Sequence, residues 1–322
     1  MSTVPEILAR YLAYATDVAP STRRTCKYVV NAWLSRSRVT IAEDIEESEI
    51  VAFRSACVRD GLSPHTIERW IDYLRLMLRA SGFNPGAGRR LKLPEPDPTM
   101  PTLAEFGQVY EAAKYVDRPR LCGCDPGHYV QAMLAVGLWT GLRLGDWFLL
   151  DWSDVSGDVI STRATKTSKV HKFPMCSVVR RHLARLPRKK SGPIFPVWAP
   201  CPTRLREMLA RLCDDVKVKP FGPQQIRRLS VNTWADASPV CGALIQGSGL
   251  GRGSAMPWYL ATDKPFQVLK KAATSFAWPL GMLSKDERNT QSHEEAALIG
   301  VCRGLPLEKL KDLVRIAGAL RG

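Results

Sequence analysis

The sequence WTGLRLGDWFLLDW, from Trp139 to Trp152, places one arginine between two apolar segments. Before it, residues 129–138 have the composition of a buried helix, and residues 147–150 are again typical of a protein core. A buried guanidinium without a partner is unfavourable by several kcal/mol. Arg143 therefore either pairs with Asp146 or faces a pocket that receives an anion, and its planar donors suit phosphate.

Positive charge is concentrated in the later part of the sequence. The 322 residues carry a formal net charge of +15. Residues 1–84 hold 11 Lys and Arg against 10 Asp and Glu, so nearly all of the excess lies beyond them. Residues 159–206 contain 12 Lys and Arg and no acidic residue, a pattern that indicates a phosphate-binding surface. We expect a polyanionic partner.

The cysteines and the hydropathy pattern indicate a soluble, cytoplasmic protein without a membrane partner. The nine cysteines follow no disulfide-framework spacing and are typical of reduced thiols. No signal-peptide pattern opens the sequence, and no apolar run is long enough to span a membrane. Cys122, Cys124 and His128 suggest zinc, but a fourth ligand is not evident. We therefore expect no metal and no other cofactor.

The first 84 residues are predicted to form a small helical domain. Ser21 is expected to cap a helix that ends at Leu34, and a second helix is expected near 48–59. Ser63 followed by Pro64 predicts the start of a third helix. Its apolar residues recur at spacings of three and four and predict one buried face: Ile67, Trp70, Ile71, Leu74, Met77 and Leu78.

A second domain is predicted at 102–262, opened by the capping-box pair Thr102 and Glu105. Alternating residues at 158–164 and 170–174 predict two short strands joined by a turn. Further helices are expected at 177–186, 202–216 and 223–234. The sequence thus predicts a mainly α fold with a small β-hairpin or sheet.

Two segments lie outside these domains. Residues 85–101 are rich in Pro and Gly and are predicted to be a basic linker. Its basic residues are Arg89, Arg90 and Lys92. Residues 263–322 are predicted to be a helical tail, with helices near 266–277 and 307–320, that serves as a subunit contact or an added module.

Three segments resemble motifs of the tyrosine recombinase (phage integrase) family of site-specific DNA recombinases. TGLRLGDWFLLDWSDV is similar to its first arginine box, ATKTSKVHKFPM to its β-hairpin, and GPQQIRRLSVNTWAD to its His-x-x-Arg box. The resemblance implies that Arg143, Lys166 and Arg227 are catalytic, with Asp146 in support. It also implies that Tyr259, the only tyrosine after Tyr129, is the nucleophile. Lys169 is the alternative to Lys166.

The chemistry of phosphodiester cleavage explains this set of residue types. Two guanidiniums can hold the charge that develops on the non-bridging oxygens of the phosphate under attack. A tyrosine oxygen can attack phosphorus and conserve the bond as a phosphotyrosine, while a lysine protonates the departing 5′-oxygen. With the arginines in this role the reaction needs no metal.

Two positions depart from the family's pattern. Gln224 replaces the histidine three residues before Arg227, and glutamine cannot accept the tyrosine proton at neutral pH. Leu250-Gly251-Arg252 stands where a Leu-Gly-His triplet is usual, so Arg252 is either a third phosphate ligand or lies in a loop of different alignment. Our hypothesis is that cleavage persists with weaker base assistance.

The resemblance also implies the architecture and the partners. An N-terminal helical core-binding (SAM-like) domain and a C-terminal α+β catalytic domain would clamp double-stranded DNA as a homotetramer on two sites, associated with the nucleoid and open to accessory proteins. The expected DNA contacts are Arg89, Arg90, Lys92, Lys169 and Arg228. Two alternatives stay open: a catalytically weak or inactive DNA-binding relic or architectural protein, and a topoisomerase-like nicking-closing enzyme.

Overall fold

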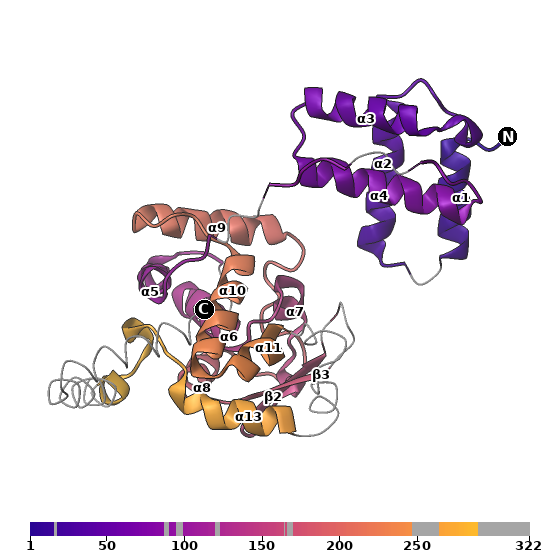
Figure 1. Ribbon diagram of the computed structural model, residues 1–322. Helices are drawn as coiled ribbons and strands as arrows, with labels where there is room; N and C mark the ends of the chain where they lie inside the picture. The colour runs from indigo at the N-terminus through magenta and orange to yellow at the C-terminus, as the bar shows by residue number, and fades with distance from the viewer. Residues whose placement is uncertain are drawn as a thin grey trace, which may run out of the picture. The chain divides into compact units, whose positions relative to one another are not determined.

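The chain folds into two compact units, Met1–Pro98 and Thr99–Gly322 (Figure 1). The structure is a computed structural model that describes residues 1–15, 18–86, 90–94, 99–119, 123–163, 165, 170–246 and 264–288. Most elements are helices, and the described residues contain one small sheet of three antiparallel strands. The predicted mainly α fold with a small sheet is thus confirmed.

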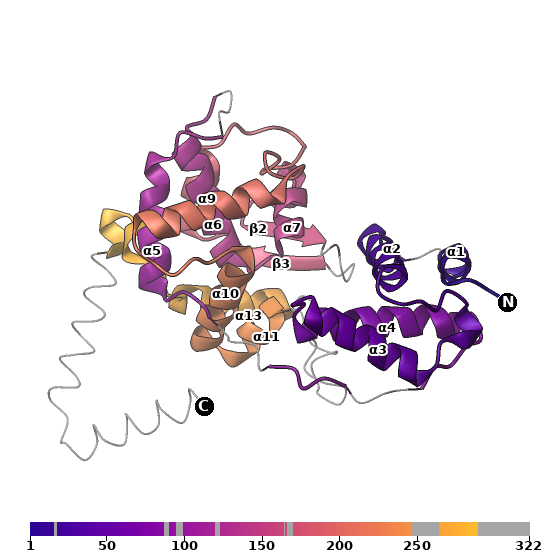
Figure 2. The ribbon, with the colours of Figure 1, turned by 90° about the horizontal axis from the view of Figure 1, so that it is seen from above.

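The described part of the first unit contains four α-helices and is organised around the last of them. The helices are α1 (Val4–Tyr14), α2 (Pro20–Leu34), α3 (Glu47–Arg59) and α4 (Pro64–Ala80). Helix α4 contacts the other three, and Figure 2 shows it between the α1–α2 pair and α3. All six apolar residues predicted for its inner face are buried in the core of this unit. Their burial explains why α4 is the centre of the unit.

The helix starts in this unit agree with the sequence prediction at one position and differ at another. Ser63 caps α4, because its Oγ accepts a hydrogen bond from the amide of Thr66 at 3.3 Å. The prediction that Ser21 caps the helix ending at Leu34 is wrong: α2 begins at Pro20, and Ala19 is its N-cap. Proline suits the first helical position because the amide it lacks would have no partner within the helix.

The described part of the predicted linker lies along α4. Four polar side chains at helical spacing on α4 bind this segment. The pairs are His65 Nε2 with the Pro94 carbonyl, Glu68 Oε1 with the Leu91 amide, Asp72 with Arg90, and Arg75 with the Gly86 carbonyl. Glu68 is itself buried in an ion pair with Arg54 at 2.9 Å. The segment that leaves α4 is therefore attached to the first unit rather than a free tether.

The second unit is built around α6 (Pro126–Thr140), whose residues from Tyr129 to Thr140 are all buried. Helix α6 packs against α5 (Leu103–Ala112), α8 (Ser177–Ala184) and α10 (Pro223–Ala237). The other helices among the described residues of this unit are α7 (Leu144–Leu149), α9 (Pro202–Asp215), α11 (Pro239–Gln246) and α13 (Lys264–Ala272). Short 3₁₀ turns occur in this unit at Ala113–Tyr115, Trp152–Asp154, Ala273–Ser275 and Leu280–Met282, and in the first unit at Ala42–Asp44. The apolar run ahead of Arg143 is thus the central buried helix that the sequence predicts.

The sheet has the order β1–β2–β3 and contains the predicted hairpin. Its strands are β1 (Val155–Ser156), β2 (Val159–Arg163) and β3 (Val170–Pro174). The β2–β3 register pairs Val159 with Pro174 and Arg163 with Val170, so the loop between the strands leaves from the Arg163 end. Helix α13 packs along β3.

Some predicted boundaries in the second unit are wrong. The helix predicted near 266–277 ends at Ala272, after which Phe276 and Trp278 leave the helical path and pack against Trp139. Helix α11 was not expected from the sequence. The helix predicted near 307–320 lies outside the described residues. Across the described ranges, none of the helices is both long and apolar enough to cross a membrane.

Candidate active site

Gly141 ends α6 and sets the path of the chain into Arg143. Its φ of +55° is a left-handed conformation that glycine adopts without strain. A Cβ at this position would lie 2.6 Å from Ile245 Cγ2 and 2.8 Å from Ser230 Oγ, so glycine also permits the close approach of α10 and α11. Arg143 then occupies the N-cap position of α7 in extended backbone and is half-buried.

Arg227, on α10, is held by main-chain carbonyl groups. It is only 8% exposed. Its Nη1 donates to the carbonyl oxygen of Gly141, and its Nη2 donates to those of Gln246 at 2.6 Å and Ile245 at 3.4 Å. These acceptors come from the ends of α6 and α11, which carry the partial negative charge of a helix C-terminus. The guanidinium is thus fixed between two helix ends.

The two guanidiniums lie close enough to influence each other. Burial lowers the pKa of Arg227, the nearby charge of Arg143 lowers it further, and Asp146 acts in the opposite direction, so that the pKa is about 10. Arg227 stays protonated at neutral pH. In the part of the chain that the structure describes, neither Arg143 nor Arg227 forms an ion pair with a carboxylate. The arrangement carries excess positive charge and is suited to an anion.

Asp146 holds the hairpin loop. The residue is 3% exposed, and its Oδ1 accepts hydrogen bonds from the Thr165 amide at 2.9 Å and the Thr165 hydroxyl at 2.7 Å. Its Oδ2 is buried and has no hydrogen-bond partner among the described residues. The alternative in which Asp146 pairs internally with Arg143 is therefore wrong, because this carboxylate binds Thr165 instead.

Comparison with known proteins identifies the fold. No protein-family model matches the chain, and no curated protein sequence matches it. Solved structures do match. The lambda integrase dimer bound to a COC′ core site aligns with a TM-score of 0.59 at 18% identity, over 79% of this chain and 97% of that one. The Tn1549 transposon integrase with a circular intermediate DNA aligns with a TM-score of 0.63 at 16% identity, over 91% and 100%. This chain has the tyrosine recombinase fold.

Three of the predicted site residues that the structure describes lie near one another: Arg143, Asp146 and Arg227. Gln224 lies exposed in the first turn of α10, one turn before Arg227, and the adjoining Arg228 is also exposed. In the first unit, Arg90 pairs with Asp72 and Lys92 is exposed. The other predicted residues lie outside the described ranges: Arg89, Lys166, Lys169, Arg252 and Tyr259.

Two features of this site were missed by reasoning from the sequence. One is Thr165, whose bonds to Asp146 span 19 positions, and the other is the set of carbonyl groups around Arg227. Gly141 indicated a tight helix end, but nothing in the sequence indicated that its carbonyl oxygen accepts a hydrogen bond from Arg227. Among the residues placed by the structure, no three His, Cys, Asp or Glu side chains gather as for a metal, and Cys122 falls outside that set.

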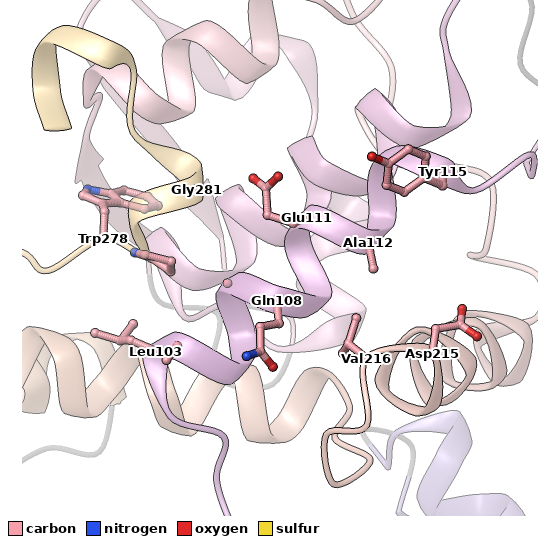
Figure 3. A pocket seen from close by; sticks show the side chains of 12 residues that line it. Leu103, Gln108, Glu111, Ala112, Tyr115, Asp215, Val216, Trp278 and Gly281 are labelled. Carbon is pink, nitrogen blue, oxygen red and sulfur yellow. The ribbon is translucent and has the colours of Figure 1, made fainter.

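A cavity of about 860 Å³ in the same unit is separate from this site. Figure 3 shows it between α5 and the segment that carries Trp278 and Gly281, beside Val216 just after α9. Its described lining is mainly apolar and includes none of the predicted site residues. The cavity therefore lies apart from the charged group formed by Arg143, Asp146 and Arg227.

Proposed function

We propose that this chain is a site-specific DNA strand transferase that cuts and rejoins duplex DNA through a 3′-phosphotyrosine intermediate. The observation that carries the proposal is the pair of neighbouring guanidiniums, Arg143 and Arg227, without a carboxylate ion pair in the described residues. Two arginines fixed beside each other suit a phosphodiester whose charge increases during attack. The fold supports the same function, because the similar lambda and Tn1549 integrases were solved with DNA.

The proposed reaction runs in two balanced steps. The phenol oxygen of Tyr259 attacks phosphorus and loses its proton to water, and the bond from phosphorus to the 5′-oxygen breaks. The ammonium group of Lys166 gives its proton to that departing oxygen. In the second step, a 5′-hydroxyl of another strand gives its proton to the neutral Lys166 amine and attacks the phosphotyrosine, and the tyrosine oxygen leaves and regains a proton from water. Arg143 and Arg227 hold the non-bridging oxygens throughout, and Arg252 is a third candidate ligand.

The charge distribution supports double-stranded DNA as the partner. The net charge of +15 lies almost wholly beyond residue 84. We assign backbone contacts to Arg89, Arg90, Lys92, Lys169 and Arg228. The proposed parts are a core-binding domain at 1–84, a linker at 85–101, a catalytic domain at 102–262 and a tail at 263–322. A lambda integrase tetramer bound to a Holliday junction aligns with a TM-score of 0.56 at 18% identity, which supports tetramer assembly.

A covalent trapping experiment tests the proposal. Duplexes selected from a random pool for tight binding are nicked close to the binding site, so that the short cleaved strand diffuses away and the phosphotyrosine accumulates. The parent protein is expected to form a denaturation-resistant complex with the DNA, and Tyr259→Phe is expected to form none. Tyr115→Phe, at a tyrosine 87% exposed, is the control and is expected to behave as the parent.

The second candidate is a DNA-binding relic or architectural protein, and it is favoured by Gln224 and Arg252 at the positions where the family has histidines. Retained sequence-specific binding without any covalent complex would support that candidate and contradict the enzyme. Site-independent relaxation of supercoiled DNA would instead indicate a nicking-closing activity.

A further inference from the structure

We propose that the turn after α8 is a second DNA-binding surface, which contacts the phosphate backbone of duplex DNA away from the cleavage site. It presents three consecutive basic residues, Arg188, Lys189 and Lys190, which we call the basic turn. All three are exposed, and none forms an ion pair with a carboxylate among the described residues. The proposed reaction does not use them. The inference rests on the part of the proposed function that makes duplex DNA the partner.

The segments on both sides of the basic turn lie at the start of α6. A Cβ on Gly123, which shortly precedes α6, would lie 3.9 Å from Pro187 Cγ, just before the turn. After the turn, the rings of Phe195 and Trp198 contact the ring of Tyr129 in the first turn of α6, at centroid separations of 5.6 Å and 5.7 Å. The basic turn is therefore located at the N-terminal end of the central helix.

The arginine pair lies at the other end of this helix. Gly141 follows the last residue of α6 and accepts a hydrogen bond from Arg227, and Arg143 is two positions further on. Helix α6 has 15 residues, so a rise of 1.5 Å per residue puts its ends about 22 Å apart. This exceeds the distance of about 8 Å over which physiological salt screens a charge. A phosphate bound by the basic turn is therefore not the phosphate held by Arg143 and Arg227.

The main chain on both sides of the basic turn is held in place. Leu186 before it is 6% exposed, and Ile194 after it is 4% exposed. Asp151 Oδ2 accepts a hydrogen bond from the Gly192 amide at 2.7 Å, and the Ile194 amide donates to the Leu150 carbonyl at 2.8 Å. Gly192 has a φ of +106°, which glycine adopts without strain. Such anchoring presents the basic side chains to solvent and lowers the entropy lost on binding.

A structural role within the protein does not account for the basic turn. Basic residues stabilise the C-terminus of a helix, but the effect is confined to its last turn. Arg185, the C-cap of α8, fits that explanation, whereas Arg188 and the two lysines lie beyond the helix. Among the described residues, none of these three side chains has a hydrogen-bond partner. Their charge is therefore available to a partner outside the chain.

The composition of the turn favours DNA over an acidic protein. Protein interfaces are usually built on a desolvated apolar centre, whereas a phosphate backbone is bound by Lys and Arg with the release of counterions. The other exposed residues of the turn are Pro187 and Ser191, and its apolar neighbours Leu186 and Ile194 are buried. The surrounding range 159–206 contains no acidic residue. The basic turn thus offers charge without an apolar centre.

The test asks whether the full chain binds a second duplex while its cleavage site is occupied. The protein is saturated with an unlabelled, intact duplex selected for tight binding. A fluorescent duplex of random sequence is then titrated at several salt concentrations, with anisotropy as the measurement. The turn variant combines Arg188→Gln, Lys189→Gln and Lys190→Gln. The control variant removes the same charge from exposed positions elsewhere in this unit by Lys270→Gln, Lys271→Gln and Lys285→Gln. Thermal unfolding checks that both variants are folded.

The expected effect is a change in salt dependence. Each phosphate contact contributes about −0.9 to the slope of log K against log salt concentration, so loss of three contacts should make the slope less steep by about 2.7. The turn variant should also bind the second duplex at least about tenfold more weakly than the parent at 0.1 M salt. The control variant should keep the parental slope, because a charge that touches no phosphate releases no counterion.

Three results would overturn the inference. They are a parental slope for the turn variant, equal losses in the turn and control variants, and turn-dependent binding of a polyglutamate peptide that is tighter than that of the second duplex. The proposed strand transfer can fail separately. In that case the parent would form no Tyr259-dependent covalent complex on the nicked duplex, while binding of the second duplex would still depend on the basic turn.

Discussion

The guanidinium of Arg227 donates a hydrogen bond to the carbonyl oxygen of Gly141, 86 positions earlier in the chain. This bond joins α10 to the end of α6 and places Arg227 beside the loop that leads to Arg143. Arg227 has further carbonyl partners at the end of α11. The two arginines therefore differ: the Arg227 guanidinium is held by the main chain of two helix ends, whereas the Arg143 guanidinium has no hydrogen-bond partner among the described residues.

Replacing Gly141 with alanine is expected to destabilise the second unit through crowding as well as backbone strain. The new Cβ would meet Ile245 and Ser230 at 2.6 Å and 2.8 Å, in addition to the unfavourable φ of +55°. We expect a loss of about 3 kcal/mol in the free energy of unfolding. Gly157→Ala is the matched control, because Gly157 has the same φ of +55° and no atom within 4 Å. In denaturant unfolding, Gly157→Ala should lose only about 1 kcal/mol in the free energy of unfolding. Equal losses for the two variants would contradict a contribution from crowding at Gly141.

Lysine substitutions should separate the two arginines. Arg227→Lys loses carbonyl bonds that an ammonium cannot reproduce in the same plane, and we expect a loss of about 2 kcal/mol in stability. Arg143→Lys should change stability by less than about 0.5 kcal/mol, because no hydrogen bond or ion pair of its guanidinium occurs within the described ranges. Both variants should slow cleavage about 100-fold or more. Equal stability of the two variants would refute the distinction.

Restoring a histidine at position 224 should accelerate cleavage. Gln224 is exposed one turn before Arg227, where an imidazole would have room and could accept a proton at neutral pH. We expect Gln224→His to raise the single-turnover cleavage rate about tenfold or more. Gln224→Asn keeps an amide and should give no increase. A rate for Gln224→His equal to that of the parent would argue against weak base assistance.

Glu287 should make a pH-dependent contribution to stability. Burial alone raises its pKa, but hydrogen bonds from Ser177 and Ser284 and the charge of Arg181 outweigh burial and bring the pKa to about 2, from 4.5. Because the folded-state pKa is the lower one, the contribution is complete above about pH 5 and is lost as the pH falls from 4.5 to 2. Glu287→Gln should therefore be less stable than the parent at pH 7, by about 1–2 kcal/mol.

The difference between the parent and Glu287→Gln should shrink steadily below pH 4.5 in urea unfolding. Glu207→Gln, at an exposed position of α9, serves as the control and should match the parent at every pH. If the stability difference between Glu287→Gln and the parent did not depend on pH, the carboxylate charge of Glu287 would not be what binds this residue to α8.

Local chemistry explains the parts of the fold that the sequence predicts well. The apolar positions of α4 recur at helical spacing, and a helix with one apolar face must bury it. The alternation in β2 and β3 and the capping box at Thr102 and Glu105 depend on neighbours close in the chain. The start of α2 was missed because serine and proline compete as local signals, and proline at the first helical position prevailed.

The sequence by itself determined most of the segments that become helices or strands, though not α11 or β1, and that the later part is basic, because these follow from side-chain pattern and charge within a few turns. Only the tertiary structure decided that Asp146 binds Thr165 rather than Arg143, and that Arg227 rests on the carbonyl groups of two helix ends. Such choices depend on which distant groups share a buried space. There a polar atom takes the partner that packing brings within hydrogen-bond distance, and neither residue type nor spacing specifies that partner.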